Sequence, residues 1–295
     1  MKRSVSSARF YTGLALGAAL LLATEPSQAA GAAIPHGTVE LVAENQWIQP
    51  AHESYLGLHF ELEKGWHIYW VNPGDSGEPP RVAWQLPTGV TVGEIQWPTP
   101  QRLGTSSIVD FGYEDGVTLL VPVQVEARFG AKGPTQAQLG AQVKVLVCRE
   151  ICIPGKAQLS LTVQIQSQPA LADVRTHELF ATARKSLPHT PPSNWKFSVA
   201  DSKDAFVLKA NLGKRITEAT FFPLAESQID NAAAQKLVPE TSGFRLTLRK
   251  SDRLLKPIER LKGALVVSGG GSYLIDVPVD RRAATGKAES EAKQP

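Results

Sequence analysis

The chain has 295 residues, a formal net charge of +3 and two cysteines. This near balance of charge argues against a nucleic-acid partner and against strong electrostatic attraction to membranes. The length exceeds that of a typical single domain, so we expect two domains.

Residues 1–29 have the pattern of a secretory signal peptide. Lys2, Arg3 and Arg9 precede an apolar run over residues 11–24, and small residues follow before position 30. The run is shorter than the roughly 20 residues that a helix needs to cross a bilayer. We therefore expect cleavage, a mature protein without a membrane span, and localisation in the periplasm.

Alternating apolar and polar residues dominate from residue 38 onward, which is typical of half-buried antiparallel strands. The clearest case has Leu56, Leu58, Phe60 and Leu62 on one face. Gly, Pro, Asn and Asp separate further predicted strands at 82–86, 90–97, 117–125, 141–147 and 157–165. So many short strands favour an immunoglobulin-like β-sandwich over residues 30–168.

The pattern changes over residues 169–194, where we expect a helix over 171–186 and then a stiff proline-rich linker. The apolar residues at helical spacing are Leu171, Val174, Leu179, Phe180 and Ala183. Strand patterns resume and predict a second, cysteine-free β-sandwich domain over 195–280, and a disordered tail over 281–295. The predicted fold class is all-β: two immunoglobulin-like β-sandwich domains joined by a short helix and a proline-rich linker.

Cys148 and Cys152 stand where one apolar strand ends and the next begins. A tight turn over residues 149–151 would bring their Cβ atoms to disulfide distance, and an exported protein meets an oxidising compartment. Closing so short a loop contributes only about 2 kcal/mol in the chain-entropy model, which makes the pair a poor structural staple. Reversible thiol-disulfide exchange, a structural disulfide and metal binding all stay open from the residues alone.

The neighbours of the cysteines bear on these alternatives. Arg149 favours a thiolate at Cys148, whereas Glu150 opposes it. Two thiolates with His67 form a weak alternative site for Cu(I), which prefers soft ligands, but no local Cys-His spacing supports it. No phosphate-binding loop, zinc-protease helix or Gly-x-Ser-x-Gly motif occurs, so hydrolytic enzymes are poorly supported. No cofactor is expected.

The stretch "VCREICIPGKAQLSL", preceded by "GWHIYWVNPGDSGEPP" and "FGYEDGVTLLVPVQV", resembles the N-terminal periplasmic domain of the DsbD/ScsB family of thiol:disulfide interchange proteins. The resemblance covers about residues 36–168, and three motifs in order are far more specific than a cysteine pair. It implies an immunoglobulin-like domain that takes electrons from a membrane-embedded partner and passes them to thioredoxin-like periplasmic proteins. The redox pair would then be Cys148 and Cys152, in a protein-disulfide reductase or interchange component.

The resemblance also implies a cap loop that shields the cysteines. The segment "WPTPQRLG", with Trp97 and Arg102, matches the position of that loop. Tyr69, Phe111 and Tyr113 are further candidates to line or cover the site. For each of these residues the alternative is ordinary core packing or a plain loop.

The resemblance does not say which cysteine attacks first. Because Ile153 and Pro154 follow Cys152, we expect Cys152 to be the more enclosed and Cys148 to be offered to partners. No transmembrane bundle or thioredoxin-like module follows residue 280. The expected donor is therefore a separate membrane-embedded thiol reductase, and the expected acceptor is a thioredoxin-like periplasmic oxidoreductase.

One alternative function belongs to a different class. The chain would be a non-catalytic β-sandwich adaptor that retains a structural disulfide and binds a partner protein through its second domain.

Overall fold

The structure of the chain is a computed structural model that describes residues 31–104, 107–129 and 135–281. The predicted signal peptide, residues 1–29, lies outside these ranges, and so do residues 282–295 of the predicted tail. The regular secondary structure of the described residues is almost entirely β-strand, with a single helix. The predicted all-β class is confirmed.

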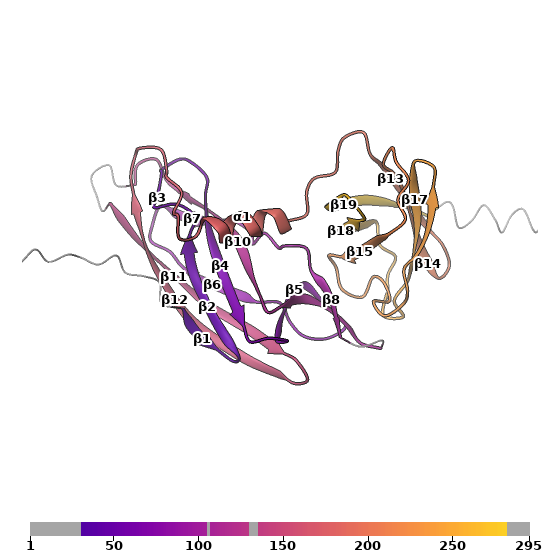
Figure 1. Ribbon diagram of the computed structural model, residues 1–295, viewed down its shortest axis with the longest axis horizontal. Helices are drawn as coiled ribbons and strands as arrows, with labels where there is room; N and C mark the ends of the chain where they lie inside the picture. The colour runs from indigo at the N-terminus through magenta and orange to yellow at the C-terminus, as the bar shows by residue number, and fades with distance from the viewer. Residues whose placement is uncertain (1–30, 105–106, 130–134, 282–295) are drawn as a thin grey trace, which may run out of the picture.

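Two facing sheets form the N-terminal β-sandwich, residues 31–165 (Figure 1). One sheet has the strand order β1-β2-β4-β10-β7, and the other has the order β3-β12-β11-β5-β9-β8, with β6 also pairing with β11. The bounds are β1 (Ala32–Ile34), β2 (Gly37–Ala43), β3 (Trp47–Ile48), β4 (Ser54–Leu62), β5 (His67–Gly74), β6 (Arg81–Gln85), β7 (Val90–Val92), β8 (Gln101–Gly104), β9 (Val109–Glu114), β10 (Gly116–Val125), β11 (Gln136–Cys148) and β12 (Cys152–Ile165).

The core of the sandwich follows from the alternation of side chains along its strands. The apolar residues predicted to share one face of β4, from Leu56 to Leu62, all belong to this core. On β11, alternate residues from Ala137 to Val147 are buried in the same core. The intervening residues of these strands therefore face outward.

The helix α1 (His177–Ser186) is shorter than the predicted helix over 171–186. Residues 171–173 are not helical and residues 174–176 form a turn, since the carbonyl of Leu171 accepts a hydrogen bond from the amide of Gln46. Phe180 is buried against the outer face of the sheet that contains β4, where Gly57 leaves room for its ring. Packing on the sandwich, rather than helix propensity, therefore decides where the helix lies (Figure 1).

The remaining strands form the C-terminal unit, residues 195–280, in the order β15-β18-β19-β13-β14-β17-β16 around a separate apolar core. Their bounds are β13 (Lys196–Asp201), β14 (Ala205–Asn211), β15 (Ala219–Pro223), β16 (Lys236–Glu240), β17 (Gly243–Arg249), β18 (Arg260–Val267) and β19 (Gly271–Asp280).

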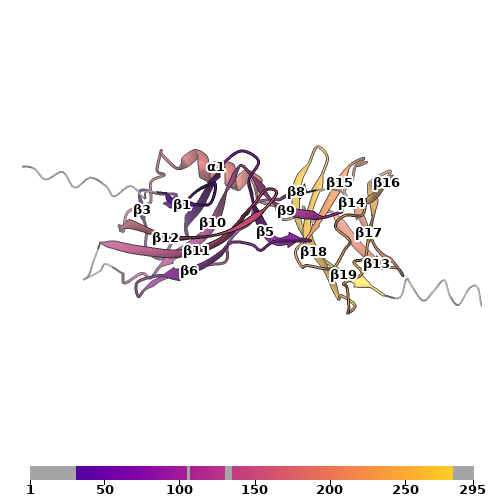
Figure 2. The same ribbon diagram turned by 90° about the horizontal axis from the view of Figure 1, so that it is seen from below.

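One aromatic side chain of the C-terminal unit enters the core of the sandwich. The ring centroid of Phe222 lies 6.4 Å from that of Trp70 and 5.3 Å from that of Phe111, both in edge-to-face geometry. Beside it, the amide nitrogen of Asn72 donates to the carbonyl of Pro223 at 2.7 Å. In both views β5 and β8 lie at the end of the sandwich that faces this unit (Figures 1 and 2).

Candidate redox site

The two cysteines close the hairpin formed by β11 and β12. Cys148 is the last residue of β11 and pairs directly with Cys152, the first residue of β12. Their Cα atoms are 4.2 Å apart and their sulfur atoms are bonded. The amide of Arg149 donates to the carbonyl of Ile151 at 3.1 Å, which closes the turn between them. The strand pairing therefore brings the two sulfurs together.

The disulfide lies on the outer face of its sheet. Val147 points into the core, so Cys148 points away from it. Trp66, just before β5, and Ile68 and Trp70 on it belong to the core, which turns His67 and Tyr69 outward. His67 is also the strand partner of Cys148. Directly paired residues share a face, so one patch of the sheet carries both cysteines, the histidine and the tyrosine.

The two cysteine residues differ sharply in solvent exposure. Cys148 is only 2% exposed, whereas Cys152 is exposed. Our expectation that Cys152 is the more enclosed is therefore wrong. The reason is the strand order: at this end of the sheet β11 lies between β5 and β12, which enclose Cys148, while Cys152 opens the outer strand of the hairpin.

Tyr69 is the side chain that contacts the exposed cysteine. Its hydroxyl oxygen lies 3.5 Å from the sulfur of Cys152, although the residue itself is only 1% exposed. Burial raises the pKa of Tyr69 to about 12, the charge of Asp110 adds to this rise, and a hydrogen bond with Ser76 opposes it. The hydroxyl is therefore protonated at neutral pH and can donate to a thiolate.

A segment of backbone, the cover loop (residues 75–80), packs on the ring of Tyr69. Gly77 lies directly against it: a Cβ atom at this position would be 2.2 Å from the ring carbon Cζ. The neighbouring Ser76 donates hydrogen bonds from its amide and hydroxyl to the buried carboxylate of Asp110, at 2.9 and 3.0 Å. The cover loop therefore encloses the ring from outside the sheet.

His67 supplies a buried ring nitrogen beside Cys148. Burial lowers the pKa of His67, against the opposing charges of Asp110 and Glu114. Its Nε2 atom is buried and makes no hydrogen bond within the part of the chain that the structure describes. The imidazole is therefore neutral at pH 7, and its Nε2 atom is left without a partner among the described residues.

Trp66 supports the turn between the cysteines. The guanidinium of Arg149 lies 5.1 Å from the centroid of its ring, and the ring of His36 stacks on it at 3.7 Å. His36 is held in turn by the carboxylate of Glu63 at 2.8 Å. Arg149, one of the candidate site residues, is thus oriented by a cation–π contact next to Cys148.

The amino-acid sequence of the first domain matches a known protein family. Residues 38–164 match the model for the N-terminal part of the thiol:disulfide interchange protein DsbD. This part of the chain is similar to the DsbD N-terminal family. The predicted resemblance is confirmed, and the DsbD-like domain carries both cysteines within the matched range.

A solved structure supports the fold across both parts of the chain. The crystal structure of the N-terminal periplasmic domain of ScsB from Proteus mirabilis is 16% identical, with a TM-score of 0.61 over 83% of this chain and 94% of that chain. This likeness shows the fold.

Other comparisons are weak. The periplasmic chaperone SfaE is 10% identical over 81% of this chain and 98% of that chain, with a TM-score of 0.19. The human Desmocollin-1 ectodomain is 10% identical over 78% of this chain and 44% of that chain, with a TM-score of 0.17. Both TM-scores are too low to indicate a shared fold. No curated protein matches the sequence.

Three of the predicted cap or lining residues of the DsbD-like domain lie in its interior. Trp97 packs against the core, partly buried, and Phe111 is fully buried between Trp70 and Phe222. Tyr113 is buried and donates its hydroxyl to the carbonyl of Pro98 at 2.7 Å. These placements correspond to the packing alternative for all three residues.

The other candidate residues divide between the cysteines and the contact with the C-terminal unit. Glu150 is exposed in the turn between the cysteines. Arg102 lies on β8 and donates to the carbonyl of Asn231 at 2.6 Å. Sequence reasoning missed His36, Gly77 and Asp110, since each reaches the site only through contacts between distant segments.

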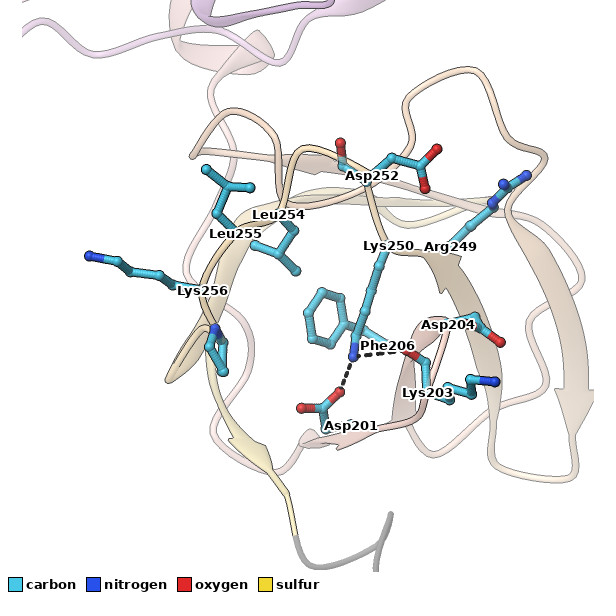
Figure 3. A pocket seen from close by; sticks show the side chains of 12 residues that line it. Asp201, Lys203, Asp204, Phe206, Arg249, Lys250, Asp252, Leu254, Leu255 and Lys256 are labelled. Atoms are coloured by element: carbon cyan, nitrogen blue, oxygen red, sulfur yellow. Dashed lines mark hydrogen bonds and ion pairs between the residues drawn. The ribbon is translucent and has the colours of Figure 1, made fainter.

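No other part of the described chain offers comparable chemistry. Within it, no group of three or more His, Cys, Asp or Glu side chains is arranged to hold a metal ion, and no helix has the length and apolar character to cross a membrane. A cavity of about 430 Å³ in the C-terminal unit is lined by residues 201–206 and 249–257 (Figure 3). Its Lys250 is already paired with Asp201 at 2.5 Å and lies over the ring of Phe206.

Proposed function

We propose that this protein is a periplasmic thiol-disulfide exchange protein that carries electrons through the pair Cys148 and Cys152. The observation that carries the proposal is the unequal exposure of two paired cysteines within a DsbD-like domain. A disulfide that only stabilised the fold would gain little from a loop this short. An exposed attacking thiol beside a buried resolving thiol suits exchange.

The reduced protein would act in two steps. The Cys152 thiolate attacks one sulfur of a partner's disulfide; that bond breaks, a mixed disulfide forms, and the partner's other sulfur leaves as a thiolate that takes a proton. Cys148 then loses its proton and attacks the sulfur of Cys152. The partner leaves as a dithiol with two electrons, and the Cys148–Cys152 disulfide forms.

Nearby side chains suit these steps. The hydroxyl of Tyr69 lies against the sulfur of Cys152 and would stabilise its thiolate. The imidazole of His67, which is the strand partner of Cys148, is the nearest candidate base for the proton that Cys148 must lose. Both groups lie on the outer face of the sheet, together with the disulfide.

The resemblance of residues 38–164 to DsbD supports two kinds of partner. The acceptor would be a thioredoxin-like periplasmic oxidoreductase, and a membrane-embedded thiol reductase would return two electrons and two protons to the pair. The signal-like segment at residues 1–29 supports export to the compartment where such partners occur.

The reduction potential of the pair tests the proposal. The mature protein is equilibrated in graded glutathione buffers and its free thiols are counted by mass. We expect a value between about −120 and −270 mV, the range of known exchange proteins. A value well below about −300 mV, with thiols that react only in denaturant, would instead indicate the structural disulfide of an adaptor.

Trapping separates the roles of the two cysteines. With Cys148→Ser, an oxidised thioredoxin-like protein should accumulate as a mixed disulfide on Cys152, because the resolving thiol is missing. Cys152→Ser leaves only the buried thiol and should trap far less. Equal trapping by the two variants would contradict the assignment.

A further inference from the structure

The C-terminal unit reaches the redox site through one polar side chain. Asn231, between β15 and β16, is only 5% exposed, and its amide nitrogen donates to a carboxylate oxygen of Asp75 at 2.9 Å. Its backbone carbonyl accepts the hydrogen bond from Arg102. The side chain of Asn231 thus binds the first residue of the cover loop.

Asp75 is held from two sides. Its amide donates to the carbonyl of Val109 at 3.0 Å, and its second carboxylate oxygen accepts from the amide of Val109 at 2.9 Å. One carboxylate oxygen of Asp75 is therefore hydrogen-bonded to β9 of the sandwich, and the other is hydrogen-bonded to Asn231. The position of Asp75 depends on both parts of the chain.

The contacts continue from Asp75 to the sulfur. Ser76 is bound to Asp110, and Gly77 packs on the ring of Tyr69 with no room for even a methyl group. The hydroxyl of that ring lies 3.5 Å from the sulfur of Cys152. Because proteins pack closely, a shift of the cover loop changes the space that holds the ring.

We propose that Asn231 is a positioning residue for the redox site. By holding Asp75, it keeps the cover loop on Tyr69 and the hydroxyl against the sulfur of Cys152. The inference deepens the proposed function and rests on it, because it concerns the reactivity of the attacking thiol. A hydrogen bond donated to a thiolate favours the charged form, so the loss of Asn231 makes Cys152 less reactive at neutral pH.

The test measures alkylation of Cys152 by iodoacetamide between pH 5 and 10, in a Cys148→Ser background where it is the only thiol. We expect Asn231→Ala to slow alkylation at pH 7 by about threefold to tenfold, within the range for a weakened hydrogen bond to a charged group, and to move the titration midpoint upward. The matched control is Asn211→Ala, at the end of β14, where the side chain binds only the local amide of Gly213. It should leave the profile unchanged.

A second variant, Tyr69→Phe in the same Cys148→Ser protein, distinguishes a positioning role of Asn231 from a general destabilisation of the fold. Tyr69→Phe removes the hydroxyl that contacts the sulfur of Cys152. In this background, adding Asn231→Ala should therefore slow alkylation no further. Equal slowing in both backgrounds would overturn the inference, and so would a wild-type profile for Asn231→Ala. Asn231→Asp replaces the donor with a carboxylate that faces Asp75, so it must slow alkylation at least as much as Asn231→Ala. Urea unfolding checks that each variant folds.

The positioning role of Asn231 and the proposed exchange function are tested by independent experiments. Alkylation needs no partner, so Asn231 can alter Cys152 even in a chain that exchanges no disulfide. A chain that exchanges disulfides while Asn231→Ala has no effect on alkylation contradicts only the positioning role.

Discussion

The backbone of Gly77 lies directly on the ring of Tyr69. A Cβ atom at position 77 would be 2.2 Å from ring carbon Cζ, and the backbone there has φ of +81°, a conformation that favours glycine. The cover loop can therefore pack on the ring only because this residue has no side chain.

Substituting this glycine should damage the site more than substituting a glycine in open space. Gly77→Ala adds a collision to the backbone strain and is expected to cost about 1–3 kcal/mol beyond that strain. Gly213 has a similar φ of +74° with nothing within 4 Å of its Cβ position, so Gly213→Ala reports the strain alone, about 1–2 kcal/mol. Urea unfolding measures the free energy of unfolding of both variants. Equal losses would mean that the ring of Tyr69 moves aside at no cost.

The unequal exposure of the cysteines predicts unequal reactivity. In the native protein, Cys152 of Cys148→Ser should react with a maleimide at least about tenfold faster than Cys148 of Cys152→Ser, since access and thiolate character govern the rate. The same pair of variants in urea serves as the control and should react at similar rates. A native Cys148 that reacts as fast as Cys152 would show that β5 and β12 do not enclose it.

The half-buried His67 predicts a loss of stability in acid. Because burial lowers its pKa below the ordinary value of 6.5, the unfolded chain binds a proton more readily than the folded chain. The stabilisation is complete above pH 6.5 and is lost as the pH falls toward the lower pKa of the folded state.

Unfolding free energies between pH 7.5 and 5 test this linkage. His67→Gln, which does not titrate, should flatten the dependence, whereas His52→Gln, on an exposed turn, should leave it in place. An identical slope in wild type and His67→Gln would exclude His67 as its source.

The insertion of Phe222 predicts that the two cores unfold together. Phe222→Ala should lower the free energy of unfolding by about 3–5 kcal/mol, because it leaves a cavity between Trp70 and Phe111. Phe197→Ala, a partly buried residue of the C-terminal core, should cost less. Unfolding is monitored by tryptophan fluorescence. Two separate transitions in Phe222→Ala would confirm that this ring couples the cores. A loss in the free energy of unfolding below about 1 kcal/mol would contradict it.

Local patterns were sufficient for the face that each side chain takes and for the predicted strands except the one expected over residues 90–97, which ends at Val92 as β7. The alternation in "GWHIYW" directs Trp66, Ile68 and Trp70 to the core and leaves His67 and Tyr69 on the other side, as the structure has them. The helix began later than its apolar spacing predicted because residues 171 and 172 pair with the segment after β2. That competition depends on a segment more than a hundred residues away.

The sequence by itself determined the all-β class, the cysteine pair and the resemblance of the first domain to DsbD, because strand periodicity and ordered motifs are local properties of the chain. Only the tertiary structure decided which cysteine is buried, since that depends on β5 and β12 lying on either side of β11. It also decided that Asn231, 79 residues beyond Cys152 in the sequence, is linked by contacts to the site. Enclosure and long-range hydrogen bonds come from strand order and packing between distant segments, which no local pattern encodes.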